Sequence, residues 1–129
     1  MAGLLLDTDV LIDYLRGTAG ASTFLEEAKT PFLISAMTVG ELYSGVREGN
    51  ERAALEVFLQ EFEIILISHE IARRGGLLCR DYRKSHGVGL ADALIAATAE
   101  IHHLELVTLN QKHFPMLDKV IVPYKKFEI

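Results

Sequence analysis

Short apolar segments alternate with helix-like segments along this chain, and that alternation constrains the fold more than any other feature. The apolar segments have the length of buried strands, and the stretches between them are amphipathic or alanine-rich, as in helices. We expect five strands, at residues 3–7, 32–34, 64–67, 106–108 and 120–122. Because strands that alternate with helices are joined by right-handed crossovers, the pattern predicts a mostly parallel sheet with helices on both faces.

The helices between these strands have recognisable ends. Gly17 is placed to end a helix over residues 8–17, and Gly87 to end the long polar helix that follows the third strand, because glycine readily adopts the left-handed conformation found there. Ser35 and Ser68 are placed to cap the helices that follow the second and third strands. The other helices are expected at residues 22–28, 51–61 and 90–101.

Length and composition indicate one domain over residues 1–129, of which half are hydrophobic. The longest apolar run, residues 1–6, is much shorter than the roughly 20 residues of a membrane helix and has no basic leader. We therefore expect a cytoplasmic protein that does not associate with membranes. The single cysteine, Cys79, excludes an internal disulfide and a thiolate zinc cluster, and it is expected to be a small core residue.

The overall charge does not by itself indicate a nucleic-acid-binding protein, since 13 Lys and Arg stand against 18 Asp and Glu, a net charge of −5. Five basic residues nevertheless lie within twelve positions of the long polar helix: Arg73, Arg74, Arg80, Arg83 and Lys84. The spacing of Arg73, Arg80 and Lys84 puts these three on one face. That face is either a local basic surface or a solvated face partly paired with Asp81 and Glu70.

Two aspartates mark the end of the first predicted strand. Asp7 follows three leucines, and Asp9 lies two residues later, in the first turn of the next helix. Because ligand sites in such sheets lie outside the carboxyl ends of the strands, a functional role for Asp7 is favoured over helix capping. Asp9 can share that site, or it can serve only to stabilise the positive end of the helix.

Two further acids lie on predicted helices. Glu41 faces away from an apolar stripe that includes Leu42 and Tyr43, among small or neutral residues, and a solvated helix face explains it equally well. Asp92 is the only charged residue of segment 88–99, which is apolar all round and is therefore expected to be a buried helix. A buried carboxylate needs a partner, which is either the helix N-terminus or a metal ion.

The strand at residues 106–108 ends in polar side chains, as the first strand does. Thr108 and Asn110 are able to reach a metal-bound water or a phosphate, although both are also ordinary turn residues. His113 follows three residues later. We expect it to be a surface or packing histidine rather than a catalytic base.

Taken together, four segments resemble the acidic motifs of PIN-domain ribonucleases of the VapC type, the toxins of VapBC toxin–antitoxin pairs. The segments are residues 5–12, Thr38-x-x-Glu41-Leu42, residues 90–99, and Thr108-x-Asn110 with His113-Phe114, and the third is the most specific. The resemblance spans nearly the whole chain. It implies a PIN-domain α/β fold with a Rossmann-like five-stranded sheet, a Mg²⁺ or Mn²⁺ site, endonucleolytic cleavage of RNA, a homodimer, and inhibition by a small VapB-like antitoxin.

The resemblance also assigns roles to individual residues. The catalytic set is Asp7, Glu41, Asp92 and Asn110, and the metal ligands are Asp7, Asp92, Glu41 and Asp9. Many PIN domains have aspartate where this chain has Asn110, which can hold a metal-bound water but brings no charge for a second cation. Carboxylates suit Mg²⁺ or Mn²⁺, which would polarise the scissile phosphate and supply hydroxide for in-line attack. The expected substrate contacts are Arg80, Lys84 and Thr108.

Three other classes remain open from the sequence. Asp7-Thr8-Asp9 also resembles the DxD signature of haloacid-dehalogenase-type phosphatases, in which the first aspartate is the nucleophile, but the apolar helix of Asp92 occupies the region where their later acids occur. A receiver domain needs an acceptor aspartate at a later strand end, and none is evident after residue 67 or at 108. A non-catalytic binding module that keeps the acids only as helix caps predicts no metal affinity.

Overall fold

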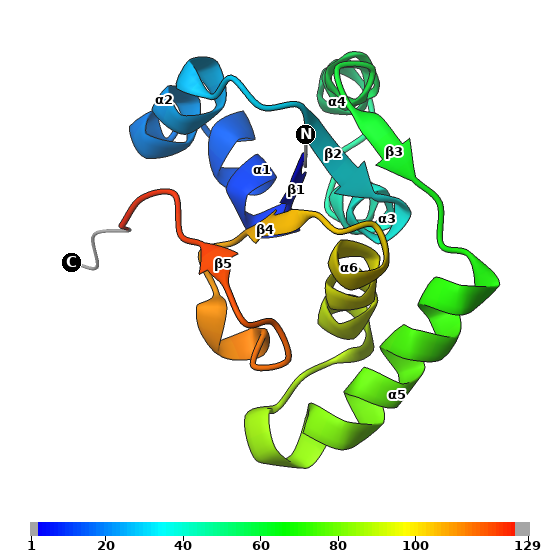
Figure 1. Ribbon diagram of the computed structural model, residues 1–129. Helices are drawn as coiled ribbons and strands as arrows, with labels where there is room; N and C mark the ends of the chain where they lie inside the picture. Colours follow the sequence, from blue (N-terminus) through cyan, green and yellow to red (C-terminus); the bar gives the residue numbers. More distant parts are fainter. Residues whose placement is uncertain (1–2, 126–129) are drawn as a thin grey trace.

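The computed structural model of the chain describes residues 3–125. At its centre lies a five-stranded sheet in the order β3-β2-β1-β4-β5 (Figure 1). The strands are β1 (Leu4–Leu6), β2 (Phe32–Ser35), β3 (Glu63–Ile65), β4 (Glu105–Val107) and β5 (Val120–Ile121). Every strand pairing among the described residues is parallel, so the predicted parallel α/β sheet is confirmed.

The helices of residues 3–125 are α1 (Thr8–Leu15), α2 (Ala19–Glu27), α3 (Ala36–Ser44), α4 (Asn50–Leu59), α5 (His69–His86) and α6 (Leu90–Ile101), with a 3₁₀ turn η1 (Gln111–His113). Both predicted serine caps are present: Ser35 accepts the N–H of Met37 at 3.0 Å, and Ser68 accepts the N–H of Ile71 at 3.1 Å. Gly87 has a φ of 65° at the end of α5, as predicted. None of these helices is long and apolar enough to cross a membrane.

Several boundaries differ from the predicted ones. The strand expected over residues 64–67 lies at Glu63–Ile65, because β3 is an edge strand and the chain leaves the sheet before Leu66, which is 75% exposed. β4 begins and ends one residue earlier than predicted, and β5 ends one residue earlier. The helix expected at residues 22–28 begins at Ala19, and the turn η1 was not predicted.

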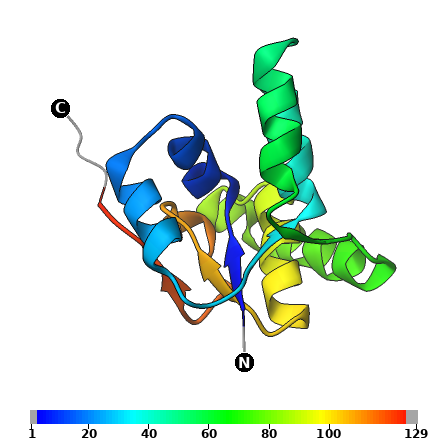
Figure 2. The same cartoon turned by 90° about the horizontal axis from the view of Figure 1, so that it is seen from above.

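Two hydrophobic clusters cover the two faces of the sheet. Leu5 and Leu106 belong to the cluster formed with α5 and α6, whereas Leu6 and Val107 belong to the cluster formed with α1, α3 and α4. This division follows the alternation of side chains along a strand. Cys79 is buried in the first cluster, as expected. Figure 2 shows α4 projecting beyond the layers that pack on the sheet.

The order of the strands creates a topological switch point between β1 and β4. From β1 the chain continues to β2 and β3 on one side, and it later returns to the other side as β4 and β5. Leu6 is in register with Val107, so the next residues, Asp7 and Thr108, meet at the carboxyl edge. Because ligands of such sheets bind at the switch point, this edge is the place to look for a functional site.

Candidate active site

Asp7 lies at the centre of this edge and is only 5% exposed. One of its carboxylate oxygens accepts the backbone N–H of Thr8 at 2.8 Å, and the other accepts the hydroxyl of Thr108 at 2.7 Å. Its own N–H donates to the carbonyl of Val107 at 2.9 Å. Asp7 therefore caps α1 and also lies at the switch point, so capping does not exclude a functional role for this carboxylate.

The surroundings of Asp7 disfavour its charged form. Burial raises the pKa of this carboxyl to about 7, and the negative charges of Asp9 and Asp92 raise it as well. The hydrogen bonds from Thr108 and Thr8 lower the pKa but do not offset burial. Asp7, Asp9 and Asp92 thus influence one another electrostatically, and a cation at this edge would relieve their repulsion.

Asp9 joins α1 to the loop that follows β4. Its Oδ2 atom accepts the N–H of Leu109 at 3.0 Å. The interpretation of Asp9 as only an aid to the helix N-terminus is therefore incomplete. The Leu109 N–H that Asp9 accepts is adjacent in sequence to Thr108, whose hydroxyl bonds Asp7.

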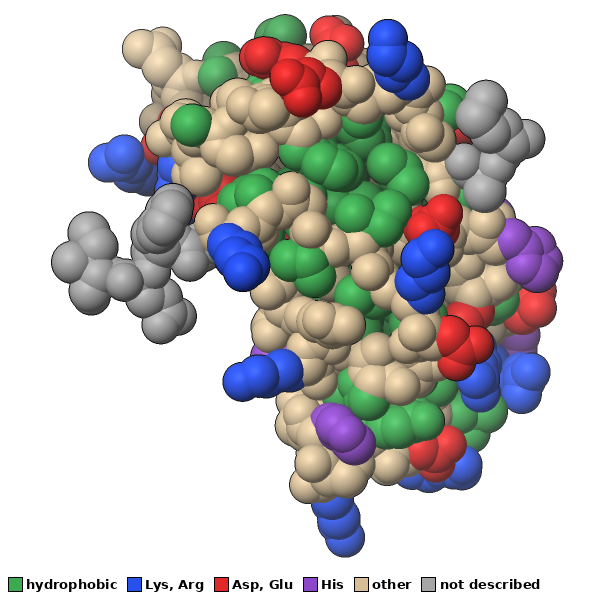
Figure 3. Space-filling model, turned by 60° about the vertical axis from the view of Figure 1, so that its left-hand side comes forward, with side chains coloured by type: hydrophobic (Ala, Val, Ile, Leu, Met, Phe, Trp, Pro, Cys, Tyr) green, Lys and Arg blue, Asp and Glu red, His purple; other side chains and the backbone are tan. Residues whose placement is uncertain are grey.

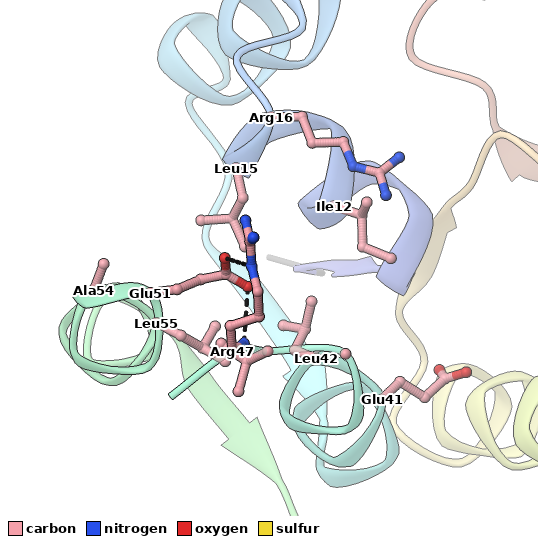
Figure 4. Close-up of a pocket in the computed structure, with 11 residues that line it drawn as sticks. Ile12, Leu15, Arg16, Glu41, Leu42, Arg47, Glu51, Ala54 and Leu55 are labelled. Atoms are coloured by element: carbon pink, nitrogen blue, oxygen red, sulfur yellow. Dashed lines mark hydrogen bonds and ion pairs between the residues drawn. The ribbon is translucent and has the colours of Figure 1, made fainter. Parts of the chain in front are cut away.

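Glu41 is held by Thr8, the first residue of α1. The Thr8 hydroxyl donates to Glu41 Oε1 at 2.7 Å and lies 3.1 Å from the hydroxyl of Thr38. Because Thr8 has one hydroxyl hydrogen, donation to Glu41 leaves Thr38 to donate to Thr8. Thr38 and Leu42 are buried in α3, whereas Tyr43, predicted to belong to the apolar stripe, is 37% exposed. The Glu41 side chain points away from Leu42 and toward α6 (Figure 4).

Asp92 lies in the first turn of α6, but it does not cap the helix. The N-cap residue is Gly89, and no side chain caps this end. The partner of Asp92 is His113, whose Nδ1 lies 3.1 Å from Asp92 Oδ2. Burial raises the pKa of Asp92, and the contact with His113 opposes that rise. The capping role that the sequence allowed for Asp92 is therefore not the one observed.

His113 is the site-edge residue that sequence reasoning missed. Its Nδ1 also lies 2.7 Å from Nδ2 of Asn110, so one ring atom contacts two of the predicted catalytic residues. The sequence predicted a surface or packing histidine rather than a catalytic base, and it did not predict these two contacts. The spacing of three residues was the available signal, because one helical turn brings such side chains together.

Thr108 has a different role from the predicted substrate contact. Its side chain is completely buried, its hydroxyl donates to Asp7, and the same oxygen accepts the N–H of Asn110 at 3.0 Å. A hydroxyl enclosed in this way cannot touch a substrate. Thr108 instead orients Asp7.

Comparison with known proteins identifies the family of the chain. The PIN domain family matches residues 4–120. This chain belongs to the PIN-domain family. Two curated relatives from Mycobacterium tuberculosis are ribonuclease VapC10, 41% identical over 94% of this chain and 92% of the relative, and ribonuclease VapC19, 42% identical over 93% and 98%. A solved toxin–antitoxin complex from Klebsiella pneumoniae contains a chain that is 35% identical, with a TM-score of 0.82 over 96% of this chain and 100% of that one.

Membership of the PIN-domain family confirms the fold class inferred from the four motifs. The family match begins in β1 and ends in β5, so it includes Asp7, Glu41, Asp92 and Asn110 in a single domain pattern. It leaves the phosphatase and receiver alternatives without support.

The carboxyl edge of the sheet around Asp7, Asp9, Glu41 and Asp92, here called the acid edge, has the chemistry of a divalent-cation site. Within residues 3–125 no three His, Cys, Asp or Glu side chains already converge as a metal cluster. The donors are nevertheless hard carboxylate oxygens from Asp7, Glu41 and Asp92, the ligands that Mg²⁺ and Mn²⁺ prefer. The raised pKa of Asp7 also reflects acids close enough to repel one another. These residues fit a divalent cation better than any softer metal.

The basic residues of α5 interact mostly with their neighbours. Arg74 pairs with Glu100 of α6 at 2.9 Å, and Arg80 pairs with the adjacent Asp81 at 3.0 Å. The Arg80 side chain is 70% exposed, and Lys84 is exposed as well. In the described part of the chain, no hydrogen bond or ion pair links either residue to the acid edge. On the face drawn in Figure 3, Lys and Arg are scattered among acidic and neutral side chains.

A groove of about 540 Å³ lies beside the acid edge, between α1, α3 and α4 (Figure 4). The residues that line it include Ile12, Leu15, Arg16, Leu42, Val46 and Leu55. The Arg47–Glu51 ion pair, with an N–O distance of 3.1 Å, forms part of its wall. Because Glu41 also lines the groove, any molecule bound there would lie next to the acid edge.

Proposed function

We propose that this PIN domain is a Mg²⁺- or Mn²⁺-dependent endoribonuclease and the toxin of a type II toxin–antitoxin pair. The observation that carries the proposal is the place of Asp7 at the switch point between β1 and β4, with Glu41 bonded to the adjacent Thr8 and with Asp92 near enough to raise the pKa of Asp7. Relatives at 41–42% identity that are named ribonuclease VapC support the reaction class. The three carboxylates, with Asp9 beside them, would hold the cation, which supplies a Lewis acid for the scissile phosphate and an activated water.

The chain's own contribution is to fix these groups before RNA binds. Thr108 and the N–H of Thr8 hold the two oxygens of Asp7, and the Thr8 hydroxyl holds Glu41. Groups held in this way need little reorganisation during the reaction. Asn110 orients a water or a phosphate oxygen, but it brings no negative charge for a second cation.

RNA binding requires cations away from the acid edge, because the carboxylates repel the phosphates that flank the cleavage site. We assign this contact to Arg80 and Lys84, which are exposed on α5. Among residues 3–125 the ion-pair partner of Arg80 is Asp81, and a surface pair of this kind contributes at most about 1 kcal/mol, so a phosphate can replace it. The proposed RNA substrate supports action in the cytoplasm.

Two protein partners belong to this proposal. The first is a small VapB-like antitoxin, supported by the Klebsiella pneumoniae toxin–antitoxin complex; lying in the groove beside Glu41, it would cover the acid edge. The second is another copy of the chain. The edge strand β3 and the segment after it leave Ile64, Leu66 and Ile67 between 37% and 75% exposed, and apolar clusters of this kind mark protein interfaces.

The test combines metal binding with RNA cleavage. The purified protein is titrated with Mn²⁺ and assayed on total cellular RNA and on a generic single strand, with and without EDTA. Cleavage should require the metal, and Asp7→Asn and Asp92→Asn should both weaken Mn²⁺ binding and abolish cleavage. Asp118→Asn, which changes an exposed acid before β5 and away from the carboxyl ends of the strands, is the matched control. If Asp7→Asn and Asp92→Asn left the Mn²⁺ affinity unchanged, the proposal would be wrong, and a non-catalytic binding module would be the better description.

A further inference from the structure

His113 stands at a defined position above the first turn of α6. It is the last residue of η1, and its N–H donates to the carbonyl of Asn110 at 3.0 Å. The next residue, Phe114, is 2% exposed and anchors the turn in the hydrophobic core. The imidazole itself is 41% exposed, so it does not serve as packing for the core. The backbone therefore sets the place of the ring, while its polar atoms remain available for the site.

The contacts of the ring determine which of its nitrogens carries hydrogen. Nδ1 lies 3.1 Å from Asp92 Oδ2, and a carboxylate can only accept a hydrogen bond. We therefore assign the ring hydrogen to Nδ1, which makes Nδ1 the donor to Asp92. Nδ1 also lies 2.7 Å from the amide of Asn110, whose oxygen and nitrogen have nearly the same shape. With Nδ1 as the donor, we assign the amide oxygen of Asn110 to the atom that faces the ring, so that the Nδ1 hydrogen is shared between Asp92 and Asn110.

We propose that His113 is a positioning residue that holds Asp92 and Asn110 in one orientation through Nδ1–H. The contact engages Asp92 Oδ2 and leaves Oδ1 for the divalent cation. In this arrangement His113 links Asn110, which carries no charge, to Asp92. The inference deepens the proposed nuclease function and rests on it, because it assigns the residue that orients a ligand of the same cation.

Two amide variants separate the two ring nitrogens. An asparagine side chain places its NH₂ group near the position of Nδ1, whereas the longer glutamine places it near the position of Nε2. If His113 acts through Nδ1, His113→Asn should preserve the contact with Asp92, and His113→Gln should not. If His113 instead acts as a catalytic base or contacts the substrate through Nε2, His113→Gln should retain more function than His113→Asn. If the role of His113 is purely structural, the two amide variants should behave alike.

The experiment measures Mn²⁺ affinity of the full chain by titration, together with RNA cleavage as a function of Mn²⁺ concentration. Loss of an outer hydrogen-bonding partner of a metal ligand typically weakens binding about 10- to 100-fold, and we expect that loss for His113→Ala and His113→Gln. His113→Asn should stay within about threefold of the wild type, well inside that range. Raised Mn²⁺ should restore the maximal cleavage rate of His113→Ala. His102→Ala, an exposed histidine at the other end of α6, is the control.

A double variant then tests whether His113 acts through Asp92. In the Asp92→Asn background, adding His113→Ala should cause no further loss of Mn²⁺ affinity. If Asp92→Asn loses Mn²⁺ while all His113 variants bind it like the wild type, the positioning role is wrong and the nuclease proposal stands. The positioning role is also wrong if His113→Gln retains binding and His113→Asn loses it. If the wild-type chain itself binds no Mn²⁺, the metal-dependent function fails, and the role of His113 fails with it.

Discussion

The acid edge and helix α5 both carry clusters of charge, but they are built in opposite ways. At the acid edge, Thr108 reaches Asp7 across 101 positions of the sequence, and the resulting bond is buried. On α5, Arg80 pairs with the residue next to it, and its side chain is 70% exposed. The fold therefore fixes the positions of the acids, whereas it leaves the basic side chains free to rearrange.

This difference teaches where substitutions should act together. Groups that share a buried network influence one another, so removal of one acid changes the pKa values and contacts of the rest. Exposed pairs on a helix contribute little each and act almost independently. We therefore expect large, interdependent effects at the acid edge and small, additive effects on α5.

The largest effect should come from Asp92→Asn and Asp7→Asn. Each removes a carboxylate that we propose as a metal ligand, and each should lower RNA cleavage by more than about 100-fold, the upper end of the losses caused by removing a hydrogen-bonding partner of a ligand. Cleavage rates at several Mn²⁺ concentrations provide the measurement. The double variant Asp7→Asn/Asp92→Asn tests whether the two acids act together. If its fold-loss of cleavage equalled the product of the two single fold-losses, the acids would act independently, and the contrast with α5 would disappear.

Asp7→Asn should also stabilise the metal-free protein at high pH. The pKa of an aspartate is ordinarily 3.8, and that of Asp7 in the folded protein is about 7. Between these two values the native state keeps a proton that the unfolded chain has lost. Stability therefore falls as the pH rises from about 4 to about 7 and stays lower above that range. In EDTA at about pH 8 the variant should gain on the order of 2–4 kcal/mol in the free energy of unfolding.

Denaturant unfolding at about pH 4 and about pH 8 measures this gain, which should be small at the lower pH. Glu63→Gln, at the exposed start of β3, is a matched control and should show little gain at the higher pH. Equal stability of the wild type and Asp7→Asn at the higher pH would mean that burial does not penalise this carboxylate.

Asn110→Ala should have a smaller effect than Asp92→Asn, because the amide orients water or phosphate but does not neutralise the cation. We expect about a 10-fold loss of cleavage, at the low end of losses for an outer partner. Asn110→Asp tests the missing fourth acid and should strengthen Mn²⁺ binding. Complete loss of activity in Asn110→Ala would place the amide among the indispensable groups.

The smallest effects should come from Arg80→Ala and Lys84→Ala. Each removes one phosphate contact and should weaken RNA binding a fewfold while reducing the salt slope by about one. Binding measured over a salt series on an RNA that the wild type cleaves gives both quantities. Arg52→Ala, which breaks ion pairs with Glu48 and Glu56 on and beside α4, is the control. If both α5 variants bound RNA like the wild type across the salt series, the proposal that this helix contacts RNA would be wrong.

Features set by local pattern were predictable from the sequence. The bounds of α6, the caps at Ser35 and Ser68, and the left-handed end at Gly87 depend on residues within a few positions of one another. The position of Asp7 at the carboxyl edge was also predictable, because it follows from the order of strands and helices rather than from any side-chain contact.

Contacts between distant residues were not predictable in this way. Periodicity shows which face of a helix is apolar, but it does not show that Thr108 would be buried against Asp7 or that His113 would meet Asp92. The buried Asp13 is a further case, since its Oδ2 accepts the hydroxyl of Tyr124, 2.7 Å away and 111 positions later. Burial of this kind depends on the packed fold, and local sequence does not encode it.

The place of β1 at the middle of the sheet also has a consequence for the time at which activity arises during synthesis. A nascent chain carries Asp7, Asp9 and Glu41 early, but β4, which pairs with β1, and the loop that binds Asp9 come 100 residues later. Closing so long a loop is slow compared with local folding. The proposed nuclease centre is therefore complete only after β4 and the loop that follows it have left the ribosome, so we expect an unfinished chain to cleave no RNA.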